Sequence, residues 1–323
     1  MRKIIAALAA LGLLLTGCAA GETGSTGSSD GIKVVATIFP AFDWAANLMD
    51  GTGVTPALLM KNGVDMHSFQ PTAADIVSLS DADLFIYVGG ESDAWVEDAL
   101  KNARNENMIA LNMMDILADA VQHEEHVEGM ESDHAYEHDH EEEEYDEHVW
   151  LSLGNAESVC AALSDALCQI DKDHAETYEA NLAAYTGALE ALDTEYRAAV
   201  SEAPLQTVLF GDRFPFLYLM EEYGLAYFAA FPGCSAETEA SFATVSFLAG
   251  KVDELSLPAV LTIDGSDRKI AQTIVQNTAA GNAEILTLDS MQSVTDEQIA
   301  GGVSYLSIME ENLSVLKKAL GTP

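Results

Sequence analysis

Residues 173–204 read DHAETYEANLAAYTGALEALDTEYRAAVSEAP, and apolar side chains recur along them every three or four positions. This period places the apolar residues on one face of a single α-helix. Asp173 with Glu176 predicts the capped start of the helix, and Pro204 prevents its continuation. We call residues 171–203 the spine helix and expect about 29 helical residues, roughly 40 Å long. Its apolar stripe comprises Tyr178, Leu182, Tyr185, Leu189, Leu192, Tyr196 and Ala199.

Short apolar or β-branched runs alternate with helical patterns on both sides of the spine helix. This alternation predicts parallel sheets covered by helices. The fold is therefore predicted to be α/β, with two (β/α) lobes, each built on a parallel four-stranded sheet, and with a ligand cleft at the carboxyl ends of the strands. A coiled-coil dimerisation arm is the alternative interpretation of the spine helix. The predicted strands are 32–38, 55–60, 84–89, 108–112, 207–211, 225–231, 259–264 and 284–289.

The N-terminus is predicted to carry the chain out of the cytoplasm. A positively charged start precedes an apolar run that is too short for a transmembrane helix, which is typical of a signal peptide over residues 1–17. The sequence Leu-Thr-Gly-Cys that ends at Cys18 resembles a bacterial lipobox, in which this cysteine is lipidated. Residues 18–31 are rich in Gly, Ser and Thr and are expected to form a flexible tether.

The remaining chain divides into three predicted parts. Residues 32–170 form the N-terminal lobe, which includes an acidic loop. The spine helix, residues 171–203, links this lobe to a C-terminal lobe over residues 204–323.

The charge balance excludes several partners. The chain has 14 Lys and Arg against 53 Asp and Glu, a formal net charge of −39. Nucleic-acid affinity comes mostly from Lys and Arg that neutralise phosphates, so nucleic acid is not an expected partner. Hydrophobic residues make up 49% of the chain, enough for substantial cores. An acidic surface of this kind suits cations.

The acidic insert, residues 122–148, differs from the rest of the chain. It holds 13 acidic residues, six of the eight histidines and no Lys or Arg. It has too few apolar residues to fold alone, and His-rich tracts often bind metals. A solvated acidic linker is the alternative, although Asp and Glu alone would serve solubility. The expected accessory metal ligands are His123, His126, His134, His138 and His140.

No catalytic motif is recognisable, so the chain is not expected to be an enzyme. It lacks a Walker loop and His-Glu-x-x-His. Apart from Cys18, the cysteines are Cys160, Cys168 and Cys234. No Cys-x-x-Cys pair is present, so these are expected to be small buried side chains rather than a thiolate zinc site. Their disulfide state stays open.

Two histidines lie in loops that are predicted to face the cleft. His67 stands in GVDMHSFQPT at 63–72, just after a predicted strand. His148 stands in HVWLS at 148–152, directly after the acidic insert. His174, near the start of the spine helix, is expected on the surface.

Together these features resemble the solute-binding proteins of bacterial zinc and manganese ABC importers. The resemblance rests on the two histidine motifs, the acidic insert, the spine helix and Leu-Asp-Ser at 288–290, and it extends over 32–320. It implies a C-clamp of two lobes around a buried metal, and delivery to a membrane permease with an ATPase. A His-rich insert is typical of the zinc branch.

The resemblance also implies a ligand set. His67 matches the first ligand of the family, His148 the second and Asp289 the acidic fourth. The third, a His or Glu in the family, aligns with Gly211, which has no side chain. Asp212 next to it is the expected substitute. Three further acids are left open as ligands: Asp264, Glu237 and Glu239.

We therefore expect a monomeric, lipid-anchored, extracytoplasmic protein that binds zinc and feeds an ABC permease and its ATPase. The alternatives are a manganese or iron importer component, and a surface metal chelator or adhesin. Manganese is the alternative metal because oxygen-rich sites suit it. Imidazoles bind metal only when neutral, so capture is expected to weaken below about pH 6.

Overall fold

The computed structural model describes residues 31–131, 144–235 and 239–322. Residues 32–323 form one compact unit, so this part is expected to fold by itself. Within the described part, no helix is long and apolar enough to cross a membrane. Several predicted features lie outside the described residues: the signal peptide, Cys18 and the tether up to residue 30, and also His134, His138, His140 and Glu237.

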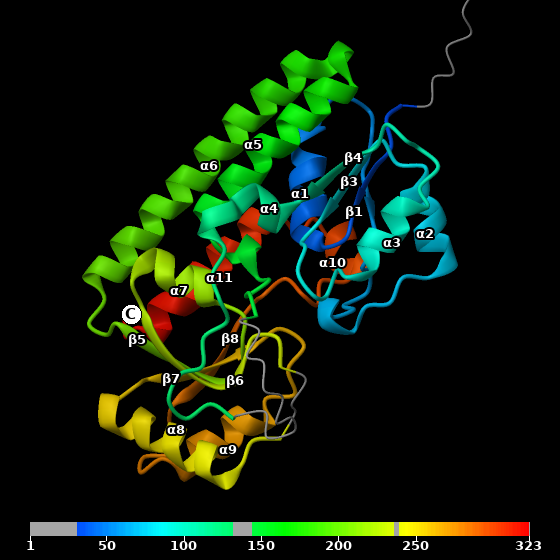
Figure 1. Cartoon of the computed structure of the whole chain (residues 1–323). Helices are drawn as coiled ribbons and strands as arrows, with labels where there is room; N and C mark the ends of the chain where they lie inside the picture. Colours follow the sequence, from blue (N-terminus) through cyan, green and yellow to red (C-terminus); the bar gives the residue numbers. More distant parts are fainter. Residues whose placement is uncertain (1–30, 132–143, 236–238, 323) are drawn as a thin grey trace, which may run out of the picture. The chain divides into compact units, whose positions relative to one another are not determined.

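Two four-stranded sheets organise the described chain, and all strand pairs in both are parallel (Figure 1). The strand order is β2-β1-β3-β4 in the first sheet and β6-β5-β7-β8 in the second. The predicted α/β fold of two lobes is confirmed. The strands are β1 Val34–Ala36, β2 Ala57–Leu58, β3 Leu84–Tyr87, β4 Ile109–Asn112, β5 Thr207–Phe214, β6 Ala226–Pro232, β7 Ala259–Ile263 and β8 Glu284–Leu288.

Helices connect the strands, and α5 packs along the longer α6 (Figure 1). Four short 3-10 turns, η1 to η4, add to the α-helices in the described residues. The α-helices are α1 Phe39–Leu48, α2 Ala73–Ser80, α3 Trp95–Lys101, α4 Met113–Leu117, α5 Leu153–Ile170, α6 Ala175–Glu202, α7 Leu217–Tyr223, α8 Phe242–Leu255, α9 Lys269–Asn277, α10 Asp296–Ala300 and α11 Tyr305–Ala319. The 3-10 turns are η1 Met66–Ser68, η2 Ala118–Ala120, η3 Val149–Leu151 and η4 Lys172–His174.

The spine helix is α6, and it ends at Glu202, before Pro204, as predicted. Its predicted start is wrong, because Asp173 lies in η4 and caps nothing at the helix start. Asp171, rather than Asp173, makes the side-chain contacts at this end of the helix. Its carboxylate lies 2.8 Å from Nδ1 of His174 and accepts a hydrogen bond of 2.8 Å from the hydroxyl of Tyr178.

One hydrophobic core runs through both lobes, so packing sets how they sit against each other. Tyr305, the first residue of α11, is fully buried and donates its hydroxyl to the carbonyl of Trp150 at 2.7 Å. Its backbone N–H donates to Asp43 of α1 at 3.0 Å. Helix α11 therefore packs on the N-terminal lobe.

Candidate metal centre

Residues that follow strands of both sheets line a cavity of about 500 Å³ between the lobes. His67 and Asp65 contribute from the N-terminal lobe, and Arg213, Asp264 and Ser293 contribute from the C-terminal lobe. This is the position where α/β sheets bind their ligands, at the carboxyl ends of the strands.

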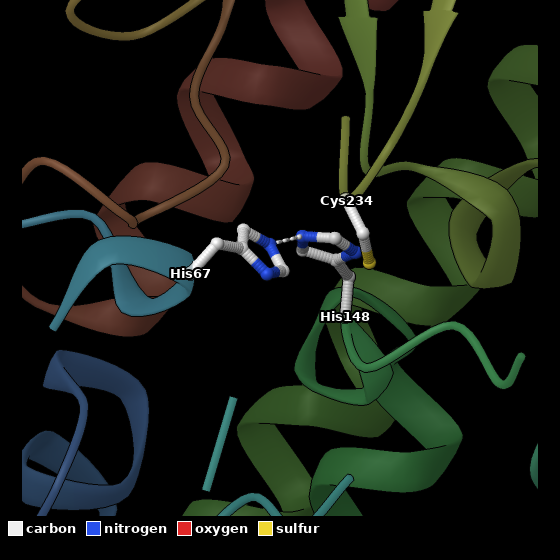
Figure 2. Close-up of side chains that lie close together, drawn as sticks. All are labelled: His67, His148 and Cys234. Atoms are coloured by element: carbon white, nitrogen blue, oxygen red, sulfur yellow. Dashed lines mark hydrogen bonds between the residues drawn. The ribbon is translucent and has the colours of Figure 1, made fainter. Parts of the chain in front are cut away.

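His67 is placed by a capped 3-10 turn. Asp65 precedes η1, and its carboxylate accepts the backbone N–H of His67 at 3.0 Å. The ring Nδ1 lies 2.9 Å from the hydroxyl oxygen of Ser92. The Nε2 atom is directed at the ring of His148, and the two Nε2 atoms lie 3.2 Å apart (Figure 2).

His148 is placed in the same way, by an aspartate two residues before it. One carboxylate oxygen of Asp146 accepts the backbone N–H of His148 at 2.8 Å and lies 2.9 Å from the ring Nδ1. A carboxylate on the second nitrogen fixes the tautomer and orientation of a metal-binding imidazole. The ring has no exposed surface. Asp-x-His thus occurs at both positions, and this repeated pattern is a sequence signal for the pair of imidazoles.

The pKa of His67 is lowered, which keeps its ring neutral and able to bind a metal. Burial lowers this pKa to about 4, and the charge of a protonated His148 acts in the same direction. At neutral pH the His67 ring is uncharged, which is the form that binds metals. The His67 ring therefore stays in its metal-binding form to a lower pH than an ordinary imidazole does.

Cys234 completes a group of three donors that the sequence did not predict. The ligand atoms of His67, His148 and Cys234 all lie within 4.8 Å of one another (Figure 2). In the chain described by the structure, no other three His, Cys, Asp or Glu residues are grouped in this way. Cys160, Cys168 and Cys234 are all free thiols. A single thiol without a Cys-x-x-Cys partner carries no local signal, because only the fold brings it to the imidazoles.

The two carboxylates predicted as ligands have other partners. Asp212 accepts hydrogen bonds from the hydroxyl of Ser266 and from the backbone N–H of Arg213. Asp289 accepts the backbone N–H of Met291 at 2.7 Å. Among the described residues, neither carboxylate joins a three-donor group as close as the one above. Their role as ligands stays a prediction.

The pKa of Asp289 is raised by its buried position and by a neighbouring carboxylate. Burial raises it to about 7, and the negative charge of Asp264 adds to this effect. Asp264 itself accepts hydrogen bonds from the backbone N–H groups of Ser290 at 2.7 Å and Ser293 at 2.9 Å. Glu239 is exposed. The hydrogen bonds of Asp264 hold the loop after β8, and the ligand roles of Asp264 and Glu239 stay predictions.

Arg213 does not neutralise its neighbour Asp212. Its guanidinium binds Asp65 of the other lobe, with 2.6 Å between Nη2 and the carboxylate oxygen. Burial alone would raise the pKa of Asp65, but the charge and hydrogen bond of Arg213 outweigh it and lower that pKa. This ion pair joins the lobes next to His67.

The described base of the acidic insert contacts the C-terminal lobe. Glu124 accepts the backbone N–H of Cys234 at 3.0 Å, and the N–H of Glu131 donates to the carbonyl of Ala230 at 2.9 Å. The exposed ring of His123 stacks on Tyr145, with 4.3 Å between the ring centroids. His126 is also exposed. The insert therefore begins and ends beside the three-donor group.

Comparison with known proteins places the chain in a family. A family model described as zinc-uptake complex component A, periplasmic, matches residues 34–319. The high-affinity zinc uptake system protein ZnuA of Bacillus subtilis is 30% identical over 318 residues, which cover 97% of this chain and 96% of that protein. The zinc-binding protein AdcA of Streptococcus pyogenes serotype M3 is 28% identical over 88% of this chain. The chain spans only 55% of that AdcA protein.

Solved structures agree with the fold. The metal-dependent lipoprotein YcdH of Bacillus subtilis superimposes with a TM-score of 0.71 at 26% identity, covering 90% of this chain and 99% of that chain. The Zn(II)-bound ZnuA-like domain of AdcA from Streptococcus pneumoniae gives a TM-score of 0.69 at 25% identity, covering 90% and 98%. The chain belongs to the family of periplasmic zinc-uptake complex component A.

Proposed function

We propose that this protein is an extracytoplasmic, lipid-anchored zinc carrier that captures zinc between its lobes and hands it to an ABC permease and its ATPase. Membership of the zinc-uptake family and similarity to proteins named as zinc-binding support this function. A protein of this kind acts as a monomer and turns over no substrate. Zinc is its cargo.

The pair of facing imidazoles carries the proposal. Two nitrogen ligands of a tetrahedral zinc lie about 3.3 Å apart when each Zn–N bond is about 2.05 Å. The Nε2 atoms of His67 and His148 lie 3.2 Å apart. Asp146 and Ser92 hold the opposite nitrogens of the two rings, at 2.9 Å in each case. Both rings therefore present the atom a metal needs, at the required separation.

The test is a competition titration of zinc against manganese. The protein is residues 32–323 with His126, His134, His138 and His140 changed to Gln, and His123→Phe. We call it the insert-silent protein. These substitutions remove the imidazoles of the insert but keep a ring against Tyr145 and leave the contact of Glu124 with Cys234 intact.

Starting metal-free, the insert-silent protein is expected to bind one zinc tightly per chain, because its site uses nitrogen donors that prefer zinc to manganese. Manganese in large excess should not displace that zinc. Equal competition by manganese would point to a manganese importer component. The absence of any tight site would instead place metal binding in the insert and favour a surface chelator.

A further inference from the structure

We propose that Cys234 is the third ligand of the captured metal, so that zinc sits between two imidazoles and one thiolate. The inference rests on the proposed function and names a donor for its site. It also places that donor just after β6, whereas Gly211, where the family pattern has its third ligand, lies in β5.

Distances within the group support the assignment. A tetrahedral zinc with Zn–S of about 2.3 Å and Zn–N of about 2.05 Å separates sulfur from nitrogen by about 3.6 Å. The three donor atoms of His67, His148 and Cys234 already lie within 4.8 Å of one another. The separations are therefore within about 1 Å of those in such a zinc site.

Two contacts, one at Gly233 and one at Cys234, hold this backbone beside the His148 ring. A Cβ atom added to Gly233 would lie 3.1 Å from Cε1 of His148, so the chain passes this ring at a distance that suits glycine best. On the next residue, the backbone N–H of Cys234 donates to Glu124 at 3.0 Å. These contacts hold the backbone of Cys234 beside the His148 ring, and Figure 2 shows the sulfur next to that ring.

A thiolate also gives the site a chemical preference. Soft sulfur ligands select zinc over manganese, which prefers carboxylate and water oxygens. On binding, the S–H proton leaves to solvent and the sulfur electron pair forms the bond to zinc. The thiolate would thereby supply zinc selectivity that the glycine at position 211 cannot.

The test compares Cys234→Ser with Cys168→Ser in the insert-silent protein. Cys168 is a free, half-buried thiol on α5 outside the three-donor group, so its substitution is the matched control. Cys234→Ser is expected to lower zinc affinity by more than about 100-fold, beyond the range for partners that only orient a ligand. Cys168→Ser is expected to leave zinc affinity unchanged. Thermal unfolding of the metal-free proteins reports whether each variant folds.

Cobalt(II) gives a second readout that needs no substitution at the site. One equivalent added to the insert-silent protein should produce a sulfur-to-cobalt charge-transfer band in the ultraviolet, even if Cys234→Ser does not fold. Tight zinc binding without that band, and with full affinity in Cys234→Ser, would overturn the thiolate but leave the proposed function intact. Failure of the insert-silent protein itself to bind zinc would overturn the proposed function.

Discussion

Changing both His67 and His148 to Ala in the insert-silent protein is expected to abolish its tight zinc site. The expected loss of zinc affinity exceeds about 10⁴-fold, because losing even an orienting partner costs 10–100-fold and here two ligands disappear. His67 lies within η1, His148 directly precedes η3, and their Nε2 atoms are 3.2 Å apart. The measurement is a competitive titration against a zinc chelator of known affinity.

His174→Ala is the matched control for this double substitution. Its ring is 41% exposed, lies within hydrogen-bond distance of Asp171 and is neither in the lining of the cavity nor in the three-donor group. The same titration should give the affinity of the unsubstituted protein. Retention of tight zinc binding by the double variant would show that the imidazole pair is not the capture site.

Gly211→Ala is expected to destabilise the fold by about 3 kcal/mol, at the upper end of the usual cost of overpacking. Gly211 is buried in β5 against α9. A Cβ atom there would lie 2.6 Å from Cα and 3.0 Å from the backbone N of Ala271, so the helix backbone itself would have to move. The free energy of unfolding from denaturant titration measures this cost.

Gly187→Ala is the control with the opposite expected sign. Gly187 lies in the middle of α6, and a Cβ atom there meets nothing within 4 Å. Alanine in an open helix interior stabilises by about 0.5–1 kcal/mol relative to glycine. Equal effects of both substitutions would contradict the packing of β5 on α9. That packing also explains why this chain cannot carry a ligand side chain at position 211.

Most of the fold could be predicted from hydrophobic patterns. Each predicted strand is present, because short apolar runs between turns are the signal of buried parallel strands. Boundaries were less predictable. The strand predicted over 207–211 extends to Phe214 because its pairing with β6 resumes after a register shift between Phe210 and Arg213. At the start of α6, Asp171 is in contact with His174 and Tyr178 across η4, and the sequence pattern did not indicate these contacts.

The candidate site could be predicted in part. His67 and His148 follow from local motifs, and the structure brings them together as expected. Cys234 could not be predicted, because its closeness to the imidazoles arises from the folding of two lobes around one core. Asp212 and Asp289 could be named as candidate ligands from the sequence. Their hydrogen bonds to Ser266 and Met291 could not be predicted, because these bonds depend on the conformations of the loops.

The most direct test of zinc capture between the lobes is an anomalous diffraction map of residues 32–323 loaded with one equivalent of zinc. We expect a single strong peak at the zinc edge, in contact with Nε2 of both His67 and His148. A peak bound only by the other histidines and the carboxylates of the acidic insert, with the Nε2 atoms of His67 and His148 still 3.2 Å apart and no metal beside them, would contradict it.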